Sequence, residues 1–125
     1  MNLYFIIAAV LALAIGVAHS WLGERYVLMR LFRRQNIPHL FGSDDFTKRT
    51  LRFAWHITTV AWFGAAAMLF VLASFPLDAS ARMLSSVIAA TFLTSAALAL
   101  IGSRGRHLSW VVFLIIAGLI WMGRG

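Results

Sequence analysis

Four long apolar segments constrain this chain more than any other feature of its sequence. They are residues 3–22, 53–75, 83–102 and 108–123, and none contains Asp, Glu, Lys or Arg. A helix that crosses the hydrocarbon core of a bilayer needs about 20 apolar residues. The whole chain is 62% apolar and only 12% charged, whereas soluble domains are about 45–50% apolar and about 25% charged. We therefore expect an all-α integral membrane protein, a four-transmembrane-helix bundle with up-down topology.

The length favours a single membrane domain, residues 1–125, with one sizeable polar loop over residues 23–50. Pro76 is expected to end the second segment, because proline cannot continue a helix. The fourth segment, residues 108–123, is short for a span, so little tilt is expected. The stretch "MNLYF" lacks the basic start of a signal peptide, which favours a retained first helix.

Lysine and arginine gather in the loops on one side of the expected spans. Nine lie in the first and third loops: Arg25, Arg30, Arg33, Arg34, Lys48, Arg49, Arg52, Arg104 and Arg106. Only Arg82 and Arg124 lie on the other side. Cytoplasmic loops are the ones enriched in basic residues. We expect a multi-pass protein of the bacterial inner (plasma) membrane with both termini periplasmic. This distribution accounts for the net charge of +7 without nucleic acid as a partner.

The polar loop begins with a basic segment, "ERYVLMRLFRR" at residues 24–34. Its arginines scatter around a helical wheel, so the segment makes a poor amphipathic helix. It is expected either to extend the first helix into the cytoplasm or to lie at the headgroups, where arginine stems snorkel. Further along, Ser43 is a candidate cap for a helix that starts at Asp44.

Two histidines stand at similar depth near the cytoplasmic ends of the first two spans. His19 ends the first apolar run in "AHSWLGER", and His56 lies just inside the second in "LRFAWH". Arg52 and His56 share a helical face because they are four residues apart, and Glu24 closely follows His19. Ionisable groups in a membrane usually face the bundle interior. We expect one buried polar cluster at the cytoplasmic leaflet.

This cluster leaves several functions open. His19, Glu24 and His56 supply imidazole and carboxylate ligands for a metal ion, although no HExxH or ExxH pattern occurs. His19 and His56 alone could be the axial ligands of one haem b. In either case the protein would be a small redox or transport protein. The chain has no cysteine, which excludes thiolate sites.

Two further interpretations involve no cofactor. Arg49 and Arg52, with His56, could bind an anionic headgroup or a quinone, since basic pockets favour anionic lipid. His107, beside two loop arginines, is a further candidate for headgroup contact. Alternatively, the cluster is structural, and His19, Glu24, Arg52 and His56 hydrogen-bond one another to lock the first two helices.

Rows of small residues indicate where helices can pack closely in lipid. The first helix has Ala8, Ala12, Gly16 and Ser20 at a spacing of four. The third has Ser86, Ala90 and Thr94 at the same spacing. We expect each row to face another helix.

The pairing of "AHSWLGER" with "TLRFAWHITTVAW" resembles a family of small bacterial four-span membrane proteins with no established activity. The resemblance covers mainly the first 60 residues. It implies a shared use of His19, Glu24, Arg52 and His56, and it supplies no reaction.

No catalytic set emerges, so a non-catalytic accessory or lipid-interacting membrane protein is favoured over an enzyme. The metal- or haem-binding protein that uses His19 and His56 is the alternative. The expected partner is the lipid bilayer, with a homo-oligomer or a larger membrane complex left open.

Overall fold

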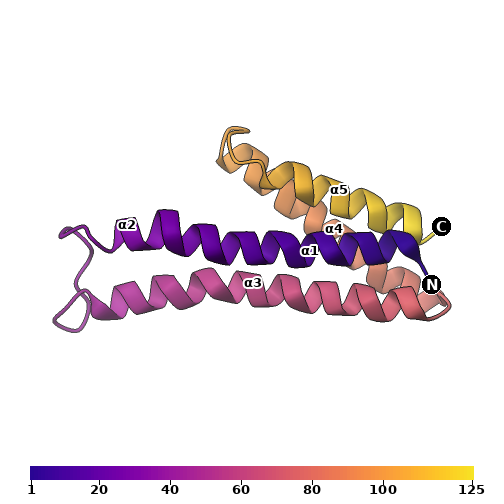
Figure 1. Cartoon of the computed structure of the whole chain (residues 1–125), viewed down its shortest axis with the longest axis horizontal. Coiled ribbons are helices and arrows are strands. Elements are labelled where there is room, and N and C mark those ends of the chain that lie inside the picture. The colour runs from indigo at the N-terminus through magenta and orange to yellow at the C-terminus, as the bar shows by residue number, and fades with distance from the viewer. The chain divides into compact units, whose positions relative to one another are not determined.

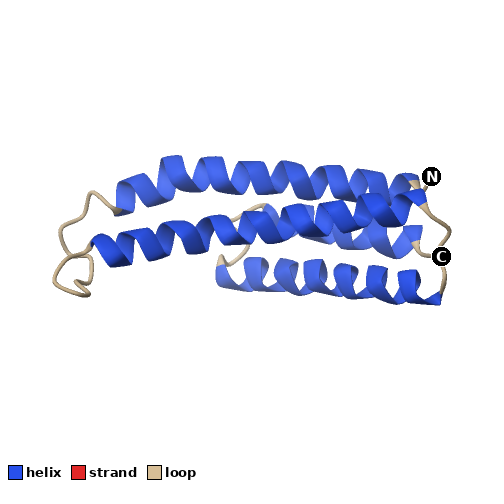
Figure 2. Ribbon diagram, turned by 90° about the horizontal axis from the view of Figure 1, so that it is seen from below, coloured by secondary structure: helices blue, strands red, loops and turns tan.

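The computed structural model describes all 125 residues and consists of helices and loops, with no strand (Figure 2). The elements are α1 (Leu3–Leu22), the π-helical segment η1 (Gly23–Leu28), α2 (Met29–Leu31), α3 (Asp45–Ser74), α4 (Ala79–Gly102) and α5 (Ser109–Gly123) (Figure 1). The expected all-α class is confirmed. Helices α1, α3 and α4 are long and apolar enough to cross a membrane, and α5 is a shorter apolar helix.

Two helices begin earlier than the apolar segments indicate, because each has a polar cap. Helix α4 begins at Ala79, where the Asp78 carboxylate accepts a hydrogen bond of 2.7 Å from the Ala81 N–H. Helix α3 begins at Asp45, well before the apolar segment that starts at residue 53 and one residue after the start expected from the Ser43 cap. The Ser43 hydroxyl accepts a hydrogen bond from the Asp45 N–H at 3.3 Å. A side-chain oxygen at these positions satisfies N–H groups that have no partner within the helix. Hydropathy alone misses these polar first turns.

Large apolar side chains cover much of the outer surface. Val60, Val87 and Ile101 are 67%, 57% and 75% exposed. Soluble proteins rarely expose apolar surface on this scale, whereas hydrocarbon solvates it. The composition of the helices and this exposed surface together indicate a multi-pass membrane protein.

The chain divides into two compact units. We call residues 16–62 the clasp unit, and residues 1–15 with 63–125 the apolar unit. Helices α1 and α3 each contribute one part to both units. Each unit is described by itself.

The apolar unit contains most of the hydrophobic core. Its buried apolar side chains are Phe5, Ala8, Ala9, Ala12, Ala66, Leu69, Leu72, Ala73, Ile88, Ala89, Phe92, Ala96, Phe113, Ile116, Ala117 and Ile120. Helix α4 packs on α5, with the Phe92 and Phe113 rings 5.9 Å apart. Asn2 joins helix ends, because its N–H donates to the Ala73 carbonyl at 2.8 Å and its side chain to the Gly123 carbonyl at 2.5 Å.

The expected rows of small residues are only partly correct. Ala8, Ala12 and Gly16 are buried as expected. On α4, however, Ala90 and Thr94 are exposed. The buried face of this helix lies one residue earlier, at Ser85, Ile88, Ala89, Phe92 and Ala96. Large side chains, which a search for small residues ignores, determine which face of α4 packs inward.

In the clasp unit, parts of α1 and α3 lie side by side and run in opposite directions (Figures 1 and 2). The basic segment extends α1 through η1 and α2 as far as Leu31, so the expected continuation of the first helix is confirmed. Its position in the cytoplasm or at the headgroups stays a prediction. Residues 32–44 then form the loop that leads to α3. This hairpin positions the polar residues of the two motifs.

Candidate functional site

His19 and Trp55 form the first contact of the polar cluster. Their rings stack with centroids 4.6 Å apart and planes inclined by 5°. The His19 Nε2–H donates to the Trp55 carbonyl oxygen at 3.3 Å, and the Trp55 indole Nε1–H donates to the His19 carbonyl oxygen at 3.1 Å. A carbonyl only accepts, so the first of these bonds requires the proton of His19 on Nε2. Each side chain thus holds the backbone of the opposite helix.

Gly23 makes the position of Trp55 possible. A Cβ atom at Gly23 would lie only 2.1 Å from the Trp55 Nε1 and 2.3 Å from its Cε2. Any larger residue would therefore displace the indole ring. Gly23 is four residues after His19, so both residues lie on the helix face that contacts Trp55.

His56 forms the second contact through two hydroxyl groups. Its Nδ1 lies 2.8 Å from the Ser20 Oγ, which lies 2.7 Å from the Thr59 Oγ1. The Thr59 hydroxyl also lies 3.4 Å from the Gly16 carbonyl oxygen, to which it can donate. With a doubly protonated imidazole the donors run from His56 through Ser20 and Thr59 to Gly16. With a neutral imidazole Thr59 donates to Ser20, which donates to Nδ1, so both protonation states are satisfied.

Glu24 forms the third contact. Its Oε1 lies 2.8 Å from the Arg52 Nη2, and its Oε2 accepts from the Arg52 Nε–H at 3.2 Å. The His56 Nε2 approaches the same Oε2 at 3.4 Å. Arg52 also lies over the Phe32 ring, with its Cζ 5.0 Å from the ring centroid. Two-point binding by arginine fixes the orientation of the carboxylate.

Helical spacing explains why these residues meet. Ser20 and Glu24 are four residues apart on one helix, and Arg52, His56 and Thr59 are four and three apart on the other. Residues at these spacings share a helix face, so two polar faces meet. We call His19, Ser20, Gly23, Glu24, Arg52, Trp55, His56 and Thr59 the clasp.

The polar groups of the clasp satisfy one another. No buried side-chain nitrogen or oxygen in the chain lacks a hydrogen-bond partner. The side chains of Glu24, Arg52 and His56 are 32%, 49% and 38% exposed, so this part of the clasp is open on one side. The arrangement joins two helices and leaves its charged end accessible.

The three proposed metal ligands do not gather around a common point. Glu24 and His56 are in contact, whereas His19 binds Trp55 instead. No group of three or more His, Cys, Asp or Glu side chains could hold a metal ion. The metal site and the bis-histidine haem stay predictions, and a Soret band or stoichiometric metal in loaded protein would establish them.

The residues expected to contact headgroups are distributed over both units. Arg52 belongs to the clasp, and Arg49 is exposed. His107 is exposed in the loop between α4 and α5, within the apolar unit, and its Nδ1 lies 2.8 Å from the Ser109 Oγ.

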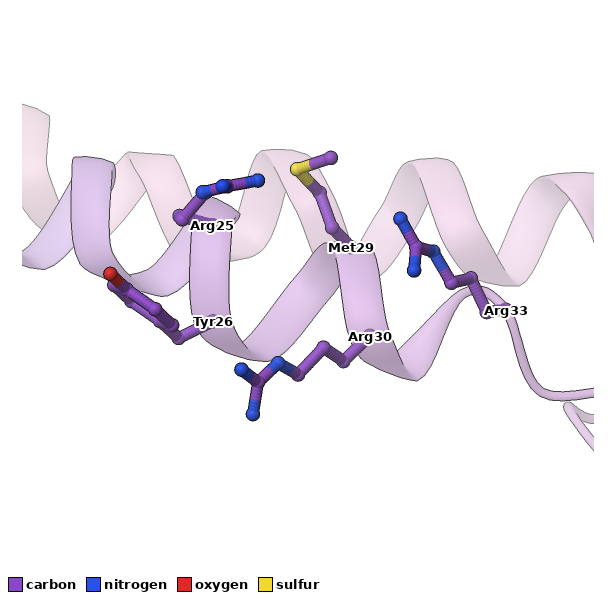
Figure 3. A pocket seen from close by; sticks show the side chains of 5 residues that line it. All are labelled: Arg25, Tyr26, Met29, Arg30 and Arg33. Carbon is purple, nitrogen blue, oxygen red and sulfur yellow. The ribbon is translucent and has the colours of Figure 1, made fainter.

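A basic pocket of about 190 Å³ lies instead on the extension of α1. Its lining residues are Arg25, Tyr26, Met29, Arg30 and Arg33 (Figure 3). The Arg30 Cζ lies 5.6 Å from the centre of the Tyr26 ring. All five residues are exposed.

Sequence reasoning missed five residues of these two sites that spacing could have found. Ser20 is four residues after Gly16 in the row of small residues, and Thr59 is three residues after His56. Arg25, Met29 and Arg33 recur every fourth residue. The helical wheel of residues 24–34 considered all the arginines together, including Arg34. The recurrence at Arg25, Met29 and Arg33 was therefore not recognised. No spacing rule indicates the close approach of Trp55 to Gly23.

No protein-family model, curated protein or solved structure matches this chain. The resemblance of its two motifs to a family of four-span membrane proteins therefore stays a prediction.

Proposed function

We propose that the chain is a non-catalytic, multi-pass protein of the bacterial inner membrane that binds anionic lipid headgroups at the cytoplasmic leaflet. The basic pocket at Arg25, Arg30 and Arg33 is the observation that carries this proposal. It lies directly beyond the 20-residue apolar helix Leu3–Leu22.

The length of the first helix supports this position. From Leu3 to Leu31 it contains 29 residues, which corresponds to about 43 Å at about 1.5 Å per residue. The hydrocarbon core of a bilayer is only about 30 Å thick. An apolar segment that fills the core would leave the basic pocket among the headgroups.

The arginines of the basic pocket form no ion pair and can therefore bind lipid phosphates. The neighbouring carboxylate, Glu24, is already paired with Arg52 and His56. Three guanidinium groups therefore face outward without an acidic partner, beside the apolar surfaces of Tyr26 and Met29. A basic residue near an anionic membrane surface contributes about 1 kcal/mol.

The clasp has a structural role in this proposal. It fixes α3 against the end of α1 and the start of η1, directly before the residues that line the basic pocket. Four spans in up-down order, with both termini periplasmic, complete the proposed topology. The exposed apolar faces leave surface for further copies or for a larger membrane complex.

A single fluorescent label tests the lipid contact. The chain has no cysteine, so Met29→Cys provides a unique attachment point for a polarity-sensitive dye beside the pocket. The labelled protein is reconstituted into vesicles of phosphatidylglycerol or phosphatidylcholine. We expect a blue-shifted emission in phosphatidylglycerol, because the arginines draw the segment onto the anionic surface.

Two sets of variants distinguish the effect of the pocket arginines from the effect of the net charge of the protein. Arg25→Gln with Arg33→Gln should abolish the difference between the two lipids. Arg106→Gln, in the loop between α4 and α5, should leave most of it. Identical emission in both lipids for the unmutated pocket would refute the proposed contact.

Reporter fusions test the orientation. A reporter active only in the periplasm should be active at the C-terminus and inactive in the loop after Leu31. A cytoplasmic reporter that is active at the C-terminus would overturn the proposed topology.

A further inference from the structure

We propose that the apolar unit binds one anionic phospholipid, with an acyl chain in a groove between α4 and α5 and the phosphate at Arg82 and Arg124. This site is separate from the basic pocket of the clasp unit, and it requires nothing from that pocket.

The groove has an apolar lining and a volume of about 360 Å³. Its lining residues are Ser86, Ala89, Ala90, Leu93, Leu114, Ala117, Gly118 and Trp121. Ala89 and Ala117 are only 5% and 7% exposed and form the floor. Leu93, Leu114 and Trp121 are 55%, 41% and 60% exposed and form the sides.

Small residues keep this groove open. A Cβ atom added at Gly118 would meet no other atom within 4 Å. Ala90 belongs to the row of small residues that was expected to pack against another helix, and it is exposed here instead. No side chain of this protein fills the space beside Gly118 in this apolar groove.

A polar mouth continues the groove. A second hollow, of about 380 Å³, is lined by Arg82, Met83, Ser86, Arg124 and Gly125. Ser86 lines both hollows, so the apolar channel and the basic mouth are contiguous. A phospholipid has the same two parts in the same order.

The two arginines of the mouth are held in place by hydrogen bonds. The Arg82 Nη1–H donates to the Arg124 carbonyl oxygen at 2.6 Å. The Arg124 guanidinium donates to the Ser86 hydroxyl and lies 3.4 Å from the centre of the Trp121 ring. Neither arginine forms an ion pair with a carboxylate. Two adjacent positive charges are stabilised by an anion, and arginine binds phosphate oxygens with directed hydrogen bonds.

Charge favours a lipid over a second copy of this chain. A copy docked through the same face would bring two more arginines to the mouth, and like charges repel. A free phosphate would leave the apolar groove unfilled. Arginine recognises the phosphate oxygens of a lipid headgroup with charge-assisted hydrogen bonds.

Photocrosslinking of the full chain in detergent micelles tests this site directly. The probe is phosphatidylglycerol with a diazirine in one acyl chain, and adducts are located by mass spectrometry. We expect adducts on Leu93, Leu114 or Trp121. Unlabelled phosphatidylglycerol should compete with them, whereas phosphatidylcholine and glycerol 3-phosphate should not.

Variants of the mouth and of the groove give independent readouts. Arg82→Gln with Arg124→Gln should reduce the adducts by about tenfold or more, because both basic contacts with the phosphate are lost. Arg82→Lys with Arg124→Lys should retain most of them, since the charge remains. Arg106→Gln is the control for net charge. Gly118→Leu fills the groove, leaves both arginines in place and should also abolish the adducts.

Thermal melting curves show whether each variant is folded. If the double glutamine variant is unfolded, the Gly118→Leu variant tests the proposal alone. Unchanged adducts in a folded Gly118→Leu variant would overturn the proposal, as would equal competition by phosphatidylcholine. Disulfide-linked dimers of Gly118→Cys that exclude the probe would show that a second copy occupies the groove and would also overturn it.

Discussion

The two units of this chain hold their helices together by different means. In the clasp unit, the contacts of α1 and η1 with α3 are made by imidazole, hydroxyl, carboxylate and guanidinium groups. In the apolar unit, α4 packs on α5 through Phe92, Phe113 and small residues. Lipid offers no hydrophobic gain for helix association, so both close packing and interhelical hydrogen bonds are available solutions. The clasp unit places ionisable groups between its two helices, so it needs the polar solution.

Position along the chain explains which solution each unit uses. The clasp lies at the boundary of the apolar segments, where Glu24 and Arg52 can remain partly solvated. The core of the apolar unit contains one fully buried polar side chain, Ser85, and its hydroxyl bonds the Arg82 carbonyl at 2.9 Å. A side chain that bonds its own helix adds no polar contact between helices.

The largest expected effect lies in the apolar unit. Phe92→Ala removes a ring that is 2% exposed, and such truncations cost about 3–5 kcal/mol in water-soluble cores. We expect the free energy of unfolding in detergent to fall markedly. Leu98→Ala, at a side chain that is 69% exposed, is the control and should change it little. Equal losses would mean that Phe92 does not hold α4 on α5.

The next effect lies in the clasp unit and depends on shape. Gly23→Ala places a methyl group within 2.1 Å of the Trp55 Nε1. The ring must move and lose its bond to the His19 carbonyl, at a cost of about 1–3 kcal/mol for overpacking. Gly64→Ala meets no atom within 4 Å and should be neutral or slightly stabilising. Thermal melts of the two variants in one detergent compare them, and a stable Gly23→Ala variant would contradict the observed packing.

A smaller effect should follow from loss of the Glu24 charge. Glu24→Gln leaves Arg52 and His56 without their carboxylate. Hydrogen bonds to charged groups contribute about 1.5–3 kcal/mol to the free energy of unfolding. All three groups are partly exposed, so we expect a loss at the lower end of this range. Asp44→Asn removes the Asp44–Lys48 ion pair, a local pair of residues four apart at 2.7 Å, and such i, i+4 pairs contribute only about 0.3–0.5 kcal/mol. Denaturation at low and high salt should separate the two variants. Equal losses would show that the clasp pair is an ordinary surface pair.

Hydropathy predicted the helical class and the approximate spans, because apolar segments without charge have few alternatives. It misplaced the start of α4, since the first turn after the Asp78 cap contains the polar residues Ser80 and Arg82. Matched depth and helical spacing correctly suggested that Glu24, Arg52 and His56 lie together. The pairing of His19 with Trp55, rather than with the other ionisable groups, depends on the space that Gly23 leaves. Such a space is a property of two packed helices and is absent from either sequence motif alone.

The central claim is that hydrogen bonds between the side chains of the two motifs stabilise the clasp unit. A double-mutant cycle of Ser20→Ala and His56→Ala, measured as the free energy of unfolding in detergent, tests that claim most directly. We expect a coupling of about 0.6 kcal/mol and at most about 1.7 kcal/mol, the average and the maximum measured for hydrogen bonds between membrane helices. Effects of the two substitutions that add within about 0.3 kcal/mol would contradict it.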